Sequence, residues 1–338
     1  MGHIYARLRA DGLYRRAVTL TVDLLIAVAF GFAVSIGAHY TGACMGMPYA
    51  AGAIRPLSAL LLMAPLAFVG ATIASEGVES TVGHGILVTP TVALGLALAV
   101  VTAALVLTSA YNFLTLPTST IQIFVFSTVG AGVAAGLPID TSTLGTLLVL
   151  WAVAPFAAFA LGFLFVRAAD RLRAPAPRAA SLGRVAIVGL VGVGAAASFA
   201  MGANDVANAS GAFIMTGLLG LVVAGAIGGA GLAVGVVSWG QPILKKVAFD
   251  LVQLDARMAT AAQLAQSTVI LVSVAFGYFT SLNQALVGAM LGTGLARGQS
   301  TVLWKPVRSI LTGWALGPVS GFALGYVLSW VALRPGFA

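Results

Sequence analysis

The chain has 338 residues, of which 60% are hydrophobic and only 8% are charged. A water-soluble protein carries roughly 25% charged residues, so this composition excludes a soluble globular protein. The net charge of +8 does not indicate a nucleic-acid-binding protein, because the basic residues cluster beside apolar stretches and are not interleaved with stacking aromatic side chains.

Apolar stretches recur along the chain. A helix that spans a bilayer needs about 20 mostly apolar residues. Six stretches meet this length, at 17–36, 56–75, 86–109, 143–166, 212–237 and 307–330. Shorter ones are interrupted by Gly, Ser, Thr or Asn, at 116–137, 185–203, 264–279 and 285–295. The pattern predicts an all-α polytopic membrane protein with about ten membrane segments.

The basic N-terminal tail, residues 1–16, leads into the first apolar stretch as it would in a signal peptide. That stretch continues into a motif that recurs later, so we interpret it as a retained membrane segment. The motif is Ile36–Gly46, and its second copy, Met201–Gly211, follows at an offset of 165 residues. A second pair of segments, Pro117–Gln122 and Phe279–Gln284, shares Thr, Ser and Gln at an offset of 162 residues.

Two motif pairs in the same order predict two membrane repeats, residues 17–166 and 185–332, joined by the basic, Pro-containing linker 167–184. In many secondary transporters such repeats have inverted topology, and their interrupted segments meet near the bilayer midplane. We therefore expect discontinuous or re-entrant half-helices from both repeats to face an anion with their N-termini. Inverted repeats put the N-terminus and the linker on opposite sides of the membrane, and we place the linker in the cytoplasm.

An acidic residue inside an apolar segment marks a candidate site for a coupling ion. Asp205 lies between Asn204 and Asn208, which share a helical face if the segment is helical. A carboxylate in a membrane segment is costly, which makes it a functional candidate. Oxygen ligands of this kind suit a hard cation such as Na⁺, held by Asp205 and Asn204, or Asp205 itself takes up a proton. The alternative is an Asp that caps a half-helix or lies at the membrane interface.

The segment Gly202–Ala209 resembles the hallmark motif of the inorganic phosphate transporter family, whose members carry it in both halves. Pro117–Gln122 resembles a second element of that family, and Phe279–Gln284 resembles it loosely. The resemblance covers most of residues 20–330. It implies a cation-coupled anion symporter built from inverted repeats.

The first half departs from the family pattern, because His39 and Tyr40 stand where the family has Asn and Asp. The continuation Ala43–Ile54 is similar to the bacterial sulfate permease branch of the family. Phosphate near neutral pH still bears a proton and needs an acceptor for it, whereas sulfate offers only acceptors and needs donors. An unpaired carboxylate would reject sulfate. A donor at Tyr40 therefore favours sulfate over phosphate.

Neutral donors in the paired segments are candidates for binding the oxyanion, although such groups also join membrane helices. The substrate-binding candidates are Ser119, Thr120, Gln122, Ser281, Asn283, Gln284, Tyr40 and Cys44. Cys44 also suits a small packing residue, and His39 suits a donor, a proton site or a packed histidine. Glu79 stands where the resembling family often has Glu, and it is either a further cation-coupling residue or a solvated interfacial carboxylate.

These observations predict a secondary active transporter that moves sulfate by Na⁺ or H⁺ symport with alternating access. Phosphate symport is the nearest alternative, followed by an anion channel. An enzyme is not expected, because membrane catalysis needs converging acid, base or metal ligands. We expect an inorganic oxyanion and the lipid bilayer as partners, no nucleic acid, a possible homodimer, no cofactor apart from the coupling ion, and a multi-pass location in the cell (inner) membrane.

Overall fold

The computed structural model describes residues 13–116, 118–171, 183–250, 255–298 and 304–334. The predicted tail falls mostly on residues 1–12 and the predicted linker mostly on residues 172–182, which lie outside the described residues, as does Pro117. The described chain is helical, with an isolated bridge between Leu87 and Ile139. The helices are α2 Leu13–His39, α3 Thr41–Ala50, α4 Pro56–Ile73, α5 Glu76–His84, α6 Leu94–Leu114, α7 Thr120–Ala135, α8 Thr141–Arg171, α9 Arg184–Met215, α10 Leu221–Asp250, α11 Ala256–Ala275, α12 Leu282–Arg297 and α13 Trp304–Ala332.

Eight helical segments of the described chain are long and apolar enough to cross a membrane. Two further helices, α7 and α12, have 16 residues each, which is shorter than the roughly 20 residues that a full crossing needs. The structure thus confirms the prediction of an all-α polytopic membrane protein with half-helices. Backbone that is not helical is tolerated at membrane depth only where protein or a cavity satisfies its polar groups.

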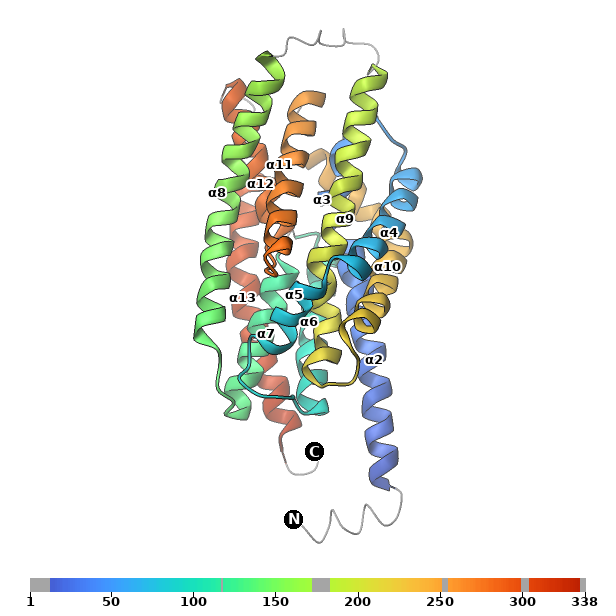
Figure 1. Ribbon diagram of the computed structural model, residues 1–338, viewed down its shortest axis with the longest axis vertical. Helices are drawn as coiled ribbons and strands as arrows, with labels where there is room; N and C mark the ends of the chain where they lie inside the picture. Colours follow the sequence, from blue (N-terminus) through green and yellow to red (C-terminus); the bar gives the residue numbers. More distant parts are fainter. Residues whose placement is uncertain (1–12, 117, 172–182, 251–254, 299–303, 335–338) are drawn as a thin grey trace.

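Corresponding helices of the two halves run in opposite directions. In Figure 1, α2 and α8 of the first half run upward, whereas α9 and α13 of the second half run downward. The beginning of α2 and the end of α8 therefore lie at opposite ends of the bundle. This antiparallel correspondence is the arrangement that an inverted repeat requires.

Two glycine contacts repeat between the halves and hold the long helices close together. A Cβ atom on Gly202 of α9 would collide with the carbonyl oxygen of Ala67 on α4. A Cβ atom on Gly37 of α2 would collide in the same way with the carbonyl oxygen of Leu232 on α10. Each partner in one contact is offset by 165 residues from its counterpart in the other. Small residues at these positions let the helix backbones touch, as is usual in membrane bundles.

Two apolar stretches have different boundaries from those predicted. The stretch at 212–237 contains a turn, because α9 ends at Met215, Gly217 has a φ of 69°, and α10 begins at Leu221. The stretch at 86–109 begins with a loop in which Val88 N donates to the carbonyl oxygen of Pro138 at 2.9 Å. Apolar composition alone does not distinguish a helix from a buried turn, so hydropathy placed both boundaries wrongly.

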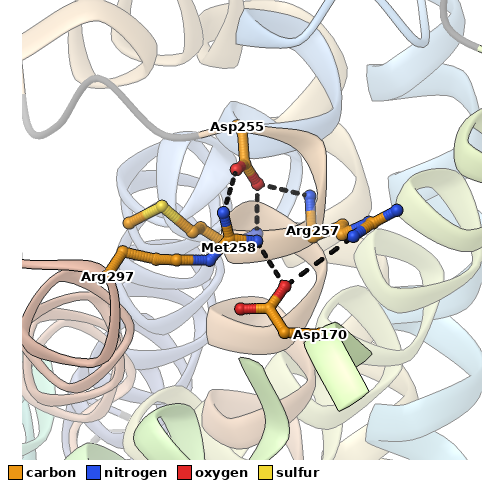
Figure 2. A network of polar contacts seen from close by, with 5 residues as sticks. All are labelled: Asp170, Asp255, Arg257, Met258 and Arg297. Atoms are coloured by element: carbon orange, nitrogen blue, oxygen red, sulfur yellow. Dashed lines mark hydrogen bonds and ion pairs between the residues drawn. The ribbon is translucent and has the colours of Figure 1, made fainter. Parts of the chain in front are cut away.

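A polar network ties together three helix ends at the upper end of the bundle (Figure 2). Asp170 near the end of α8 pairs with Arg297 at the end of α12, with an N–O distance of 2.6 Å, and with Arg257 of α11 at 3.7 Å. Asp255 also pairs with Arg297 at 3.2 Å, and it caps α11 by accepting from the backbone N–H groups of Arg257 and Met258. These side chains are between a quarter and a half exposed, so each ion pair contributes less than about 1 kcal/mol.

The backbone contact at Gly202 predicts a position-specific loss of stability. We expect Gly202→Ala to lower the free energy of unfolding by about 1–3 kcal/mol, because the new methyl group must displace the backbone of α4. Gly189→Ala is the matched control on the same helix, where a Cβ meets open space and the higher helix propensity of Ala stabilises by up to about 1 kcal/mol. Unfolding of the purified proteins in detergent measures both changes, and equal stability of the two variants would contradict the close packing.

Candidate functional site

The half-helices α7 and α12 meet with their N-termini in the protein interior. Ser119 caps α7, and its Oγ accepts from the backbone N–H of Gln122 at 3.4 Å. Ser281 caps α12 in the same way, accepting from the backbone N–H of Gln284 at 3.4 Å. The side-chain amide of Gln284 donates to Oε1 of Gln122 at 3.4 Å and joins the two ends. The structure therefore brings the two paired segments into direct contact.

This junction attracts negative charge without a basic side chain. The first four N–H groups of a helix have no partner within the helix, and they give its N-terminus a partial charge of roughly half a proton. Two such ends face the same point here. Among the described residues, the buried polar side chains include no Lys or Arg. An anion at this point would be held by helix ends and neutral donors.

The first-half motif is broken at Tyr40, between the end of α2 and the beginning of α3. The break places the phenol oxygen 3.0 Å from Oγ1 of Thr120, the first residue of α7. The same phenol oxygen accepts from the backbone N–H of Thr120 at 3.4 Å. Tyr40 is fully buried, so its hydroxyl group lies at the N-terminus of α7 and away from the surface.

His39 supports the peptide that precedes α7. Its Nε2 lies 3.2 Å from the carbonyl oxygen of Thr118, and its Nδ1 lies 2.5 Å from Oδ1 of Asn112 on α6. The Thr118 carbonyl oxygen also accepts from Nδ2 of Asn283 at 2.8 Å. Asn283, on α12, thus reaches across to the segment that precedes α7. Because Nδ1 donates to Asn112, Nε2 of the neutral ring accepts from Asn283 at 3.3 Å, and Asn283 satisfies the Thr118 carbonyl.

The second-half motif lies within the continuous helix α9, where Asn204 and Asn208 share a face. The Nδ2 of Asn204 donates to the carbonyl oxygen of Thr280 at 2.8 Å, and its Oδ1 accepts from the backbone N–H of Thr280 at 3.0 Å. This amide also donates to Oδ2 of Asp205 at 2.9 Å. The side chains of Asn204, Asp205 and Asn208 are all fully buried.

The hydroxyl group of Thr120 joins the motifs of the two halves. Its Oγ1 lies 3.4 Å from Oδ1 of Asp205 and accepts from Nδ2 of Asn208 at 3.4 Å. A carboxylate has no proton to give, so the Thr120 hydroxyl donates to Asp205. Its oxygen then accepts from the hydroxyl group of Tyr40. The chain of hydrogen bonds leaves Asp205 with oxygen atoms that only accept.

Several buried oxygen atoms at this junction have no protein partner. They are Oγ1 of Thr118, Oγ1 of Thr280, Oδ1 of Asn208 and Oε1 of Gln284. A buried polar atom without a partner costs about 1–3 kcal/mol, so four of them around one junction indicate capacity for a ligand. The hydroxyl groups can donate to an anion, and the amide oxygens can bind a cation.

Two predicted site residues lie beside this junction rather than in it. The thiol of Cys44 donates to the carbonyl oxygen of Ala197 on α9, with a distance of 3.6 Å. Glu79, on α5, is buried beside Ser210 of α9 and Gly225 of α10. Ser210 is five residues after Asp205, or about 7.5 Å along the helix axis. The roles predicted for Cys44 and Glu79 stay predictions.

Sequence reasoning missed two buried glutamines of α11. The Nε2 of Gln263 donates to the carbonyl oxygen of Ala43 at 2.8 Å and to Oε1 of Gln266 at 2.7 Å. Gln266 in turn donates to the carbonyl oxygen of Leu282, the first residue of α12, at 3.2 Å. These amides connect the first-half motif to the second half-helix. A pair of Gln three residues apart in an apolar helix was the available signal.

Comparisons with known proteins agree on one family. The model of the Phosphate transporter family matches residues 36–188 and again residues 180–325. The sulfate permease CysP of Bacillus subtilis (strain 168) is 28% identical over 318 residues, which cover 93% of this chain and 89% of that protein. A putative phosphate permease of Methanocaldococcus jannaschii is 23% identical and covers 92% of this chain and 98% of that protein. A solved structure described as the sodium-dependent phosphate transporter has a TM-score of 0.81 with 21% identity, and covers 92% of this chain and 98% of that one.

The two asparagines of α9 have unequal structural roles, which stability measurements separate. We expect Asn204→Ala to lower the free energy of unfolding by about 1–3 kcal/mol, because it leaves both backbone groups of Thr280 without a partner. Asn208→Ala removes a single 3.4 Å hydrogen bond and should cost less than about 1 kcal/mol. Unfolding of the purified variants in detergent measures the difference. A larger loss for Asn208→Ala would show that Asn204 does not hold the junction together.

Proposed function

The chain belongs to the Phosphate transporter family, and we propose that it is a secondary active transporter that carries sulfate across the cell (inner) membrane together with a cation. It is an integral membrane protein whose family members transport ions and are not enzymes. The substrate, the coupling ion and the roles of individual residues are the proposal. One of the relatives, from Bacillus subtilis, is named a sulfate permease, and another is named a putative phosphate permease.

The observation that carries the choice of sulfate is the hydroxyl group of Tyr40 at the N-terminus of α7. Tyr40 occupies the first-half place that Asp205 occupies in the second half. Sulfate is fully ionised and accepts hydrogen bonds only, so its site needs donors and excludes carboxylates. The phenol has a proton that can turn from Oγ1 of Thr120 to a bound anion, at a place where a carboxylate would repel the anion. Ser119, Ser281 and the free N–H groups of α7 and α12 supply the other donors in this proposal.

A cation on the Asp205 side completes the proposal. An uncompensated carboxylate in a membrane interior is costly, so Asp205 needs a positive partner or a proton. The side-chain oxygens of Asp205 and Asn208 are the ligands that a hard cation such as Na⁺ prefers, and Asn204 orients the carboxylate. The cation in turn neutralises charge next to the anion. This interdependence is the physical basis of coupling, and Glu79 of α5, which packs beside Ser210 on the same helix as Asp205, is a further acidic candidate for that role.

The way the two halves are interleaved supports a mechanism of alternating access. The half-helix α7 packs against α13 of the second half, and α12 packs against α8 of the first half. The helix α12 is the second-half counterpart of α7, and α13 is the counterpart of α8, so the two contacts are equivalent. A rocking motion that opens one contact and closes the other would expose the central site to each side of the membrane in turn.

Phosphate is the second candidate, and one feature favours it. Asp205 accepts a hydrogen bond from Thr120 within the junction, and an acceptor at this place suits an anion that bears a proton. A phosphate carrier would use Asp205 for this proton. A sulfate carrier would use it for the cation.

Competition between the two anions decides between these candidates. We expect unlabelled sulfate to displace bound radiolabelled sulfate from the purified protein better than phosphate does at both mildly acidic and mildly alkaline pH, since sulfate offers only acceptors throughout. Phosphate should compete weakly at both. Binding of phosphate that exceeds that of sulfate, at either pH, would identify a phosphate carrier instead.

Removal of the intramembrane charge tests the coupling. We expect Asp205→Asn to abolish the dependence of sulfate uptake on a Na⁺ or H⁺ gradient and to reduce uptake by roughly tenfold or more, as loss of support for a bound metal ion typically does. Uptake into proteoliposomes with and without each gradient measures both effects. Asp170→Asn is the matched control, because it makes the same change in the network of Figure 2, outside the junction. Normal gradient-dependent uptake by Asp205→Asn would refute the coupling role.

A further inference from the structure

The two motifs hold equivalent backbone positions, which makes their differences interpretable. Asn204 contacts the carbonyl oxygen of Thr280, which immediately precedes the Ser281 cap of α12. His39 contacts the carbonyl oxygen of Thr118, at the equivalent place before α7. The equivalence is therefore spatial as well as sequential. A group that one half offers and the other lacks at these positions is a real asymmetry of the site.

The second half offers several oxygen ligands in one place. Asn204 forms hydrogen bonds with both the carbonyl oxygen and the N–H of Thr280, at 2.8 and 3.0 Å, so both backbone groups of Thr280 already have partners. The carboxylate of Asp205 then stands one turn from Oδ1 of Asn208, which is fully buried and has no protein partner. A carboxylate and an unpaired amide oxygen are good ligands for a hard cation.

The first half lacks both of these ligands. The residue equivalent to Asp205 is Tyr40, whose hydroxyl group is a neutral donor to Thr120. The residue equivalent to Asn208 is Ala43, whose side chain has no oxygen. Beside this motif the unpartnered Oγ1 of Thr118 remains. The single neutral hydroxyl group of Thr118 does not make a cation site, and the proton of this hydroxyl is available to the anion.

Side chains also occupy the first-half backbone position that could attract a cation. The Thr118 carbonyl oxygen faces Nδ2 of Asn283 at 2.8 Å and Nε2 of His39 at 3.2 Å. The His39 ring is fixed from its other side, because Nδ2 of Asn112 donates to the carbonyl oxygen of Ser35 at 2.9 Å and so turns Oδ1 of Asn112 toward Nδ1. With Nδ1 donating to Asn112, Nε2 of the neutral ring is an acceptor, so it receives a hydrogen bond from Nδ2 of Asn283 at 3.3 Å and leaves the Thr118 carbonyl to that amide.

We propose that a single coupling cation accompanies each anion, because His39, Tyr40 and Ala43 supply no cation ligands at the first-half counterpart of the Asp205 site. The inference rests on the proposed cation symport and adds its stoichiometry. His39 is a positioning residue, which holds Asn283 against the carbonyl oxygen of the peptide before α7, whereas Asn204 holds the peptide before α12 directly. Sulfate with two negative charges and one monovalent cation moves a net single negative charge, whichever cation is coupled. Uptake must then respond to the membrane potential.

Proteoliposomes loaded to set the potential test this stoichiometry with radiolabelled sulfate. We expect the uptake rate to rise with the concentration of the coupling cation with a Hill coefficient of about one. We also expect an inside-positive potential to drive uptake, with roughly tenfold more accumulation per 60 mV for one net charge. A Hill coefficient near two, or uptake that an inside-positive potential leaves unchanged, overturns the inference but leaves symport intact. Uptake with no cation dependence overturns symport itself.

Installing the second-half residues in the first half tests the cause. The triple variant His39→Asn, Tyr40→Asp and Ala43→Asn should raise the Hill coefficient toward about two and make uptake insensitive to the potential. Tyr40→Phe is the matched control, which removes the phenol hydroxyl without adding a ligand, and its Hill coefficient should stay near one even where its uptake rate falls. An unchanged Hill coefficient in a folded triple variant would show that these three residues are not the reason why the first half lacks a cation site. If the triple variant does not fold, the potential dependence of the wild-type protein decides the question.

Discussion

The hydrogen bonds between Asn204 and the peptide of Thr280 are the interaction on which the site depends. A half-helix that begins inside a membrane leaves the backbone before it without water or helix partners, and each unsatisfied group there costs several kcal/mol. One amide with both a donor and an acceptor solves this problem for α12. The amide of Asn283, which His39 holds in place, solves it for α7. With the backbone satisfied in this way, the helix ends remain free to face a ligand.

The long helices provide the rigid frame in which these short helices can end. Backbone contacts at Gly37 and Gly202 bring α2 against α10 and α9 against α4, so the motifs that follow these glycines are held in place. Only a residue without a Cβ atom permits such an approach. The glycines lie two and three residues before the polar side chains that they position. Packing and chemistry are therefore specified by the same few residues of each motif.

Composition and internal repetition predicted the membrane class, the half-helices and the meeting of Tyr40, Thr120 and Asp205, because those properties follow from apolar length and from paired motifs. The turn before α10 was mispredicted, since its residues are nearly as apolar as the helices beside it. The contacts of Gln263 and Gln266 were missed because they depend on how α11 packs against two other segments. Resemblance alone made Glu79 a coupling candidate, whereas its position beside Ser210, five residues after Asp205 on α9, is a property of the fold.

The charged network of Asp170, Arg257 and Arg297 stands at one end of the bundle, and the equivalent positions of the other half, all among the described residues, carry no charge. At the offset of 162 residues these positions are Ala332, Gly95 and Ala135. Exposed ion pairs therefore join α8, α11 and α12 at one end of the bundle, and the matching positions of the other half offer no such pairs. Dissolved salt weakens exposed ion pairs, because ions screen their charges. A higher salt concentration would therefore loosen these three helix ends and leave the matching ends of the other half unaffected.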